Sequence, residues 1–145
     1  MKEDSLSLID SNILVYSIDS SENLKHLKAK KILSECWLNK RKCAISLQNL
    51  SEFFVIATTK VEKPISKEKC AKIVDGMIEF GNFIKLEPTS RTVRKAIDIS
   101  AKENTSYWDA LIAATMLENN VFHIYTENTK DFRISGITAI NPFEN

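Results

Sequence analysis

The stretch Leu6-Ser7-Leu8-Ile9-Asp10-Ser11-Asn12 contains a short apolar run that ends abruptly at a carboxylate and two small polar residues. A new apolar segment, Ile13-Leu14-Val15-Tyr16, begins directly after it. This pattern predicts a buried strand followed by a helix. Ligands of open parallel sheets bind beyond the carboxyl ends of the strands, so Asp10 would lie at a binding edge. A plain helix cap is the alternative for Asp10 or Asn12, because both side chains accept hydrogen bonds from free N–H groups.

The rest of the chain alternates short apolar runs with amphipathic segments. Further strands are expected at 43–47, 83–87, 121–126 and 137–140. Helical patterns fill the segments between them, and the one that begins near Asp109 is nearly all apolar, which predicts a central helix. Strands alternating with helices indicate an α/β fold, here a three-layer α/β/α sandwich with a mostly parallel central sheet. A chain of 145 residues with only three Gly and three Pro fits one domain, residues 1–145.

Two of the predicted helices have a core face that can be read from their spacing. In the segment 24–37, Leu24, Leu27 and Ile32 recur at helical intervals, and lysines occupy much of the other side as a basic outer face. The helix after Pro88 is predicted to point four side chains inward, namely Val93, Ala96, Ile97 and Ala101.

The composition excludes several classes of protein. Twenty basic and nineteen acidic residues give a net charge of +1, which argues against a protein that coats nucleic acid by bulk charge. No apolar run approaches the roughly 20 residues that span a bilayer, and residues 1–4 are charged and unlike a signal peptide, so a cytoplasmic protein without membrane contact is expected. Cys36, Cys43 and Cys70 share no metal-type spacing and are expected to be reduced, buried thiols.

Acidic residues recur where apolar elements end or begin. Asp10 closes the first strand, Glu52 lies in the helix after the second, Asp109 opens the central helix, and Asp131 follows the fourth strand. In a parallel sheet these positions meet at one edge. Two unit charges 4 Å apart repel by about 1 kcal/mol in water and about 4 kcal/mol at an effective dielectric of 20. Such a cluster therefore requires retained protons or bound cations, and oxygen ligands without histidine or thiolate favour Mg²⁺ or Mn²⁺.

The chemistry that follows from such a site is phosphodiester hydrolysis by a metal-activated water. Asp10 and Asp109 are expected as direct metal ligands, and Glu52 is expected to bind the metal through water or to orient the nucleophile. Asp131 would complete this catalytic set. Three polar residues would hold ligands and waters by hydrogen bonds, namely Asn12, Thr126 and Asn128.

Taken together, these stretches resemble the PIN-domain ribonucleases, specifically the VapC-type toxins of VapBC toxin–antitoxin pairs. The likeness runs from Leu8–Tyr16 through Ser46–Phe54 and Tyr107–Ala114 to Ile140–Phe143, in that order and at that spacing. It implies an acidic, Mg²⁺-dependent site that cleaves RNA, a VapB-type antitoxin that blocks it, and a homodimer. The family's first three acids fall on Asp10, Glu52 and Asp109. The fourth is open, because Thr126-Glu127-Asn128 lacks the acid of one family pattern whereas Asp131 fits another.

Two other functions remain for the sequence. Asn128 favours a catalytically weak PIN-like module that binds RNA or protein without cutting. An aspartyl phosphoacceptor domain fits less well, because the Asp-Ser-Asn turn lacks the second acid which that chemistry needs. Trp37, Trp108 and Phe53-Phe54 are either base-stacking platforms or packing residues, and their spacing with Leu and Ile favours packing in the core or a dimer. Several basic residues are candidates for phosphate contacts around the cleft, namely Lys60, Lys63, Lys67, Arg91, Arg94, Lys95, Lys130 and Arg133.

Overall fold

The computed structural model describes residues 5–144, so residues 1–4, on which the expectation about a signal peptide rests, lie outside the described residues. Its centre is a five-stranded sheet in the order β3-β2-β1-β4-β5. All four strand pairs are parallel; Leu8 of the central strand, for example, pairs with Ala44 on one side and Ile124 on the other. The strands are β1 (Ser7–Ile9), β2 (Cys43–Ser46), β3 (Phe83–Leu86), β4 (His123–Tyr125) and β5 (Thr138–Ile140).

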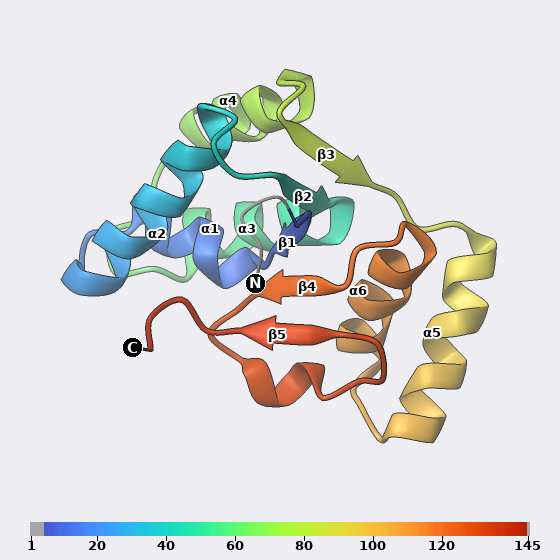
Figure 1. Cartoon of the computed structure of the whole chain (residues 1–145). Coiled ribbons are helices and arrows are strands. Elements are labelled where there is room, and N and C mark those ends of the chain that lie inside the picture. Colours follow the sequence, from blue (N-terminus) through green and yellow to red (C-terminus); the bar gives the residue numbers. More distant parts are fainter. Residues whose placement is uncertain (1–4, 145) are drawn as a thin grey trace.

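Helices cover both faces of this sheet, and the predicted three-layer α/β/α sandwich is confirmed (Figure 1). One layer consists of α1 (Ser11–Ile18), α2 (Asn23–Trp37), α3 (Leu47–Thr59) and α4 (Lys67–Glu79). The other consists of α5 (Ser90–Glu103) and α6 (Tyr107–Glu118), beside the short 3₁₀ helix η1 (Thr129–Phe132). Among the described residues no helix is both long and apolar enough to cross a membrane.

Alternation along the strands divides the core in two. Leu8 and Ile124 are buried in the cluster beneath α5 and α6, whereas their neighbours Ile9 and Tyr125 belong to the cluster beneath α1 to α4. This is the period-two pattern of a strand with both faces covered. The apolar helix α6 is buried from Ala110 to Met116, as predicted for a central helix. The strand ends and the start of α6 are therefore fixed by packing on both sides of the sheet.

The predicted core face of α2 is wrong in its first two turns. Leu24 and Leu27 are 74% and 57% exposed, because this end of the helix lies at the periphery of the molecule (Figure 1). The basic face is not wholly outward either. Lys25 pairs with Glu127, and Lys28 Nζ donates to the carbonyl oxygen of Phe143 at 3.4 Å. Contacts with the loop after β4 and with the segment near the C-terminus therefore draw these two lysines out of the solvent-facing role that the helical pattern predicts.

The predicted face of α5 is also wrong at three of its four positions. Val93, Ile97 and Ala101 are exposed, and only Ala96 is buried as expected. The helix lies on the outside of the sandwich and packs mainly against α6, so it needs only a narrow inner stripe. That stripe consists of Thr92, Ala96 and Ile99.

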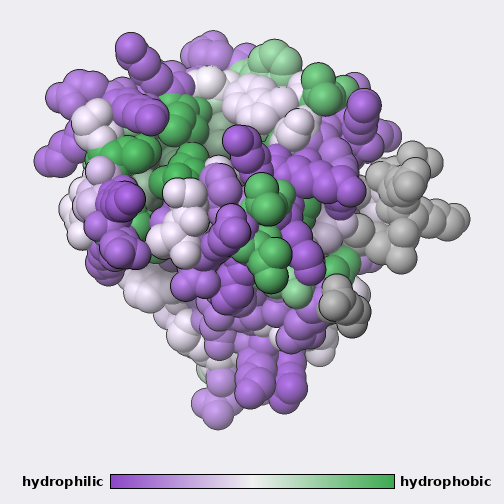
Figure 2. Space-filling view, turned by 90° about the vertical axis from the view of Figure 1, so that its left-hand side faces the viewer, coloured by the Kyte–Doolittle hydropathy of each residue, from purple (hydrophilic) through white to green (hydrophobic). Residues whose placement is uncertain are grey.

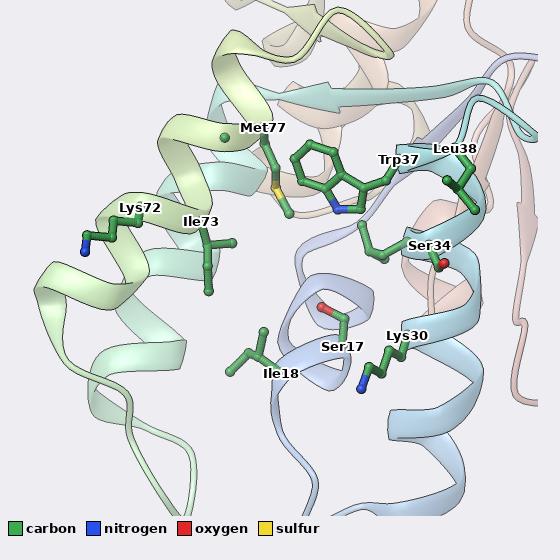
Figure 3. A pocket seen from close by; sticks show the side chains of 11 residues that line it. Ser17, Ile18, Lys30, Ser34, Trp37, Leu38, Lys72, Ile73 and Met77 are labelled. Carbon is green, nitrogen blue, oxygen red and sulfur yellow. The ribbon is translucent and has the colours of Figure 1, made fainter.

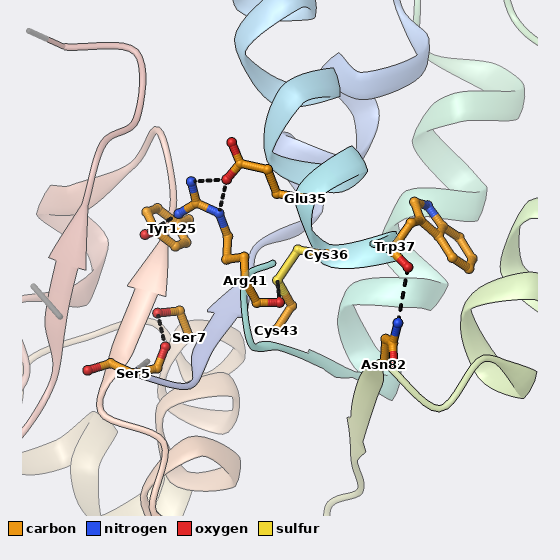
Figure 4. Close-up of a disulfide and its surroundings, with 9 residues drawn as sticks. All are labelled: Ser5, Ser7, Glu35, Cys36, Trp37, Arg41, Cys43, Asn82 and Tyr125. Atoms are coloured by element: carbon orange, nitrogen blue, oxygen red, sulfur yellow. Dashed lines mark hydrogen bonds and ion pairs between the residues drawn. A yellow bond between two sulfur atoms is a disulfide. The ribbon is translucent and has the colours of Figure 1, made fainter. Parts of the chain in front are cut away.

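The expectation of three reduced thiols is wrong for two of the cysteines. Cys36, in the last turn of α2, forms a disulfide with Cys43, the first residue of β2 (Figure 4). The connection between α2 and β2 turns back so tightly that the two Cα atoms lie 6.0 Å apart, within disulfide reach. Arg41 in the same connection bonds Glu35 and the hydroxyl of Tyr125. The third thiol, Cys70, is free and buried as predicted.

Candidate active site

Asp10 is a buried carboxylate at the carboxyl end of the central strand. It is 5% exposed and is also the N-cap of α1, so the capping and the binding-edge interpretations both describe its position. Its Oδ1 accepts hydrogen bonds from the Ser11 backbone N–H at 2.8 Å and from Asn49 Nδ2 at 3.1 Å. Its Oδ2 accepts from the Thr126 hydroxyl at 2.7 Å and from Asn12 Nδ2 at 3.4 Å. Burial raises the pKa of Asp10 despite the opposing effect of the bonds from Thr126 and Ser11.

Asn12 and Thr126, the predicted orienting residues, both donate hydrogen bonds to this carboxylate. Asn12 Nδ2 also donates to Thr126 Oγ1 at 3.2 Å, and Asn12 Oδ1 accepts from the backbone N–H of Glu127 at 3.3 Å. The exposed Asn128 takes part through its main chain, whose N–H donates to Thr126 Oγ1 at 3.0 Å. The loop after β4 is therefore tied to the start of α1 across the strand ends.

Asn49 belongs to the site and has no assigned role in the sequence interpretation. It is fully buried, and its side chain is fixed by Ser46, whose hydroxyl donates to Asn49 Oδ1 at 2.7 Å. Ser46 is the N-cap of α3, so the amide of Asn49 is oriented by the same turn that ends β2. A buried amide so close to a strand end was the available signal, but its partner Asp10 lies on another strand and is invisible to local patterns.

Glu52 reaches the same edge from the second turn of α3. It is half-buried, and its Oε1 is a buried oxygen without a hydrogen-bond partner in the described structure. Burial, together with the charges of Asp10 and Asp109, raises the pKa of Glu52 to about 7. Near neutral pH this carboxyl group can therefore either hold or accept a proton.

Asp109 and Asp131 come from two elements that contact each other, α6 and η1. Asp109 is in the first turn of α6, where its Oδ2 accepts from the hydroxyl of Ser106 at 2.8 Å. Burial raises the pKa of Asp109; the bond from Ser106 opposes that rise and the charge of Asp131 adds to it. Asp131 itself is exposed on η1.

Electrostatic effects connect the four predicted acids in a series. Asp109 acts on Asp10, both act on Glu52, and Asp131 acts on Asp109. We call this set the acid cluster. Within residues 5–144, no three His, Cys, Asp or Glu side chains are arranged to hold a metal ion. The residues nevertheless fit a hydrated hard cation: Mg²⁺ keeps several waters and needs only one or two carboxylates, and the unpaired Oε1 of Glu52 is an oxygen acceptor of the right kind.

A second polar group consists of Glu127, in the loop after β4, and its partners Tyr16 and Lys25. Glu127 accepts a hydrogen bond from the Tyr16 hydroxyl at 2.7 Å and forms an ion pair with Lys25. Burial would raise the pKa of Glu127, but these two partners lower it more strongly, so the carboxylate stays charged. The ion pair connects α2 to the loop that carries Thr126, and the hydrogen bond from Tyr16 connects α1 to the same loop.

The basic residues that were candidates for phosphate contacts lie at both ends of the sandwich. Lys60 lines a hollow of about 450 Å³ that also includes Asn12, and Lys130 and Arg133 flank Asp131. Arg91, in contrast, lies beside Glu118 at the C-terminal end of α6. That is the opposite end of the helix from Asp109, so the prediction that Arg91 borders the cleft is wrong.

An apolar groove of about 500 Å³ lies between α2 and α4, away from the acid cluster (Figure 3). Trp37 of α2 and Met77 and Ile73 of α4 point into it, with Ile18 of α1 nearby. Figure 2, viewed from the side on which α2 lies in Figure 1, shows hydrophobic side chains gathered among hydrophilic ones. Trp37 packs against Phe80 and Phe83 with ring centroids 4.9 and 4.7 Å away, so its predicted packing role is confirmed.

The chain matches a known protein family over most of its length. The family model described as "PIN domain" matches residues 7–135, which is most of the chain. No curated protein matches it significantly.

Solved structures match over nearly the whole chain. A toxin–antitoxin complex from Klebsiella pneumoniae is 25% identical, with a TM-score of 0.64, and the match covers 96% of this chain and 99% of that one. VapBC2 from Rickettsia felis, bound to a promoter DNA fragment, is 21% identical with a TM-score of 0.65 over 94% and 98%. VapC20 from Mycobacterium tuberculosis, a toxin that cleaves the Sarcin-Ricin loop, shares the fold at 12% identity, with a TM-score of 0.67 over 92% and 98%.

Proposed function

Because this chain belongs to the PIN domain family, we propose that it is the ribonuclease toxin of a toxin–antitoxin pair, and that residues 1–145 form one nuclease domain. The observation that carries the proposal is the buried Asp10 at the carboxyl end of β1, which accepts hydrogen bonds from four residues and interacts electrostatically with Glu52 and Asp109. A cap alone does not require two further acids beside it.

The acid cluster suits Mg²⁺ or Mn²⁺. Asp10 and Asp109 would hold the ion directly, and Glu52 would contact it through water. When bound, such an ion supplies Lewis-acid chemistry that activates water and stabilises negative charge on phosphate oxygens. Asp131 would extend the negative potential that attracts the ion, in keeping with its effect on Asp109.

The chain's own residues supply orientation and proton transfer. Asn12, Asn49 and Thr126 fix both oxygens of Asp10, so little reorganisation is needed when substrate binds. Glu52, with a pKa of about 7, would take the proton of the attacking water at Oε1 as the new P–O bond forms. The bond from phosphorus to the leaving sugar oxygen breaks, and that oxygen is protonated from solvent. Asn128, exposed beside Thr126, would contact waters at the mouth of the cleft.

Phosphates of the RNA would be contacted by basic side chains on the rim, Lys60 on one side and Lys130 and Arg133 on the other. Binding that releases counterions from several phosphates weakens steeply with salt. We therefore expect the affinity for RNA to fall as ionic strength rises, as measured by fluorescence anisotropy of labelled RNA. Salt-independent binding would remove these residues from the interface.

An antitoxin would cover the apolar groove between α2 and α4. The groove is lined by Trp37, Met77 and Ile73 and is large enough for the apolar face of a helix. Co-expression of Ile73→Glu with a candidate antitoxin should yield less complex than the wild type, whereas Ile97→Glu, on the exposed side of α5, should not. The resemblance also implies a homodimer, for which the exposed Leu47 and Val55 of α3 are available; light scattering would measure it.

Purified protein and RNA provide the decisive experiment. We expect cleavage in the presence of Mg²⁺ or Mn²⁺, inhibition by EDTA, and loss of cleavage in Asp10→Asn and Glu52→Gln. The matched control is Asp98→Asn, which removes an exposed carboxylate on α5. RNA binding without cleavage would support the alternative, a PIN-like binding module. Cleavage that persists in EDTA would refute the metal-dependent mechanism.

A further inference from the structure

Trp108 is the exposed exception in a buried helix. Residues 110–116 of α6 are all buried, but Trp108 is 64% exposed, which contradicts packing in the core and leaves the predicted alternative, packing in a dimer, untested. Its contact with Tyr107 is edge-on, with ring centroids 5.2 Å apart and an angle of 73° between the rings. Such a contact leaves at least one face of the indole uncovered.

The position of Trp108 is coupled to the acid cluster from two sides. It directly precedes Asp109, and consecutive Cα atoms are about 3.8 Å apart. Its backbone carbonyl accepts a hydrogen bond from Gln48 Nε2 at 3.1 Å, and Gln48 lies one turn before Glu52 on α3. An exposed aromatic ring is therefore attached to main chain that is linked to both Asp109 and the helix of Glu52.

We propose that Trp108 is a nucleobase subsite, on which an unpaired base of the RNA stacks while the neighbouring phosphodiester lies at the acid cluster. The inference rests on the proposed function and assigns base recognition to a residue outside the acid cluster. Aromatic side chains stack any base through its π-face, whereas bases within a duplex are already stacked on one another. A protein partner on the same ring is the competing possibility, which the test separates.

The chain has two tryptophans, so intrinsic fluorescence isolates the subsite. In the Glu52→Gln background with Mg²⁺, Trp37→Phe leaves only Trp108 to emit, and Trp108→Phe leaves only Trp37 as the matched control. The probe is an oligoadenylate of about ten nucleotides, with its duplex for comparison. We expect the single strand to quench emission from Trp108 and not from Trp37, and the duplex to have little effect.

Kinetics give the second readout. Trp108→Ala should raise KM for the single strand about tenfold, and Trp108→Phe should restore most of the loss, because phenylalanine also stacks. An unchanged KM in Trp108→Ala, with the wild type active, overturns the subsite but leaves the proposed function intact. A change in oligomeric state with no change in RNA affinity overturns it in favour of a protein contact. A wild-type protein that neither binds nor cleaves RNA overturns both.

Discussion

Replacing Glu52 with Gln tests the electrostatics of the acid cluster without any assay of activity. In the folded protein the pKa of Glu52 is raised from 4.5 to about 7 by burial and by the charges of Asp10 and Asp109. The folded state therefore holds a proton that the unfolded chain releases above its lower pKa. Stability is fully present below about pH 4.5 and is lost as the pH rises through 7. Glutamine resembles the protonated carboxyl group and does not undergo this loss.

The shift corresponds to at most about 3.4 kcal/mol of destabilisation above pH 7. Glu52 is only half-buried and solvent screens its charge, so about 1–2 kcal/mol is the realistic gain for Glu52→Gln at pH 8. For a chain of this length that gain raises Tm by about 3–6 °C. Near pH 4 the variant and the wild type should have the same stability, since both then carry a neutral group.

Urea denaturation of the metal-free protein across this pH range measures the effect. Glu62→Gln, an exposed acid in the turn after α3, is the matched control and should follow the wild type. Adding Mg²⁺ should stabilise the wild type more than Glu52→Gln, because a ligand of the native state raises its stability by mass action. A Glu52→Gln variant no more stable than the wild type at pH 8 would refute the raised pKa and, with it, the compact acid cluster.

Three further changes follow from the site and its surroundings. Asp10→Asn should lower the rate of RNA cleavage by at least about a hundredfold, as measured by gel assays. The free energy of unfolding, measured by denaturation, should change by about 1 kcal/mol or less, because the relief of charge repulsion is offset by the loss of the acceptor for the Thr126 hydroxyl. Asn49→Ala removes a fully buried amide and should cost about 1–3 kcal/mol and reduce kcat; an active, fully stable variant contradicts its positioning role. Reducing the Cys36–Cys43 disulfide, which closes a short loop, should cost about 2–3 kcal/mol by calorimetry and leave kcat unchanged, since Cys43 begins the strand whose other end bears the site.

The sequence predicts the layers, and the strand ends at which Asp10 and the other acids lie, because both depend on local signals. An apolar run that stops at Asp10 identifies the strand and its end, and the alternation of strands and helices makes the sheet parallel. Parallel strands place their carboxyl ends on one edge, so the position of Asp109 at the start of α6 follows from order alone.

The features that the sequence does not predict depend on which elements are neighbours. Leu24 fits a helical stripe of α2 but is 74% exposed, and Val93 of α5 is 40% exposed. Asn49 is recognisable only through Asp10 on another strand. Trp108 has the spacing of a packing residue, yet the helix that carries it turns this position toward solvent.

Asp10 and Glu52 have different hydrogen-bond environments, and this difference explains how one site can be ordered in advance and still gain stability from a ligand. Asp10 has donors on both oxygens, which offset much of the cost of its burial and fix its orientation before any ligand arrives. Within residues 5–144 one buried oxygen of Glu52 has no donor, so the charged form of Glu52 remains unfavourable until a cation or proton approaches. If both carboxylates were hydrogen-bonded like Asp10, a bound cation would stabilise the site little. If both lacked donors like Glu52, the site would be poorly ordered before a cation binds. The combination places a fixed ligand beside a group that gains stability only when the cleft is filled.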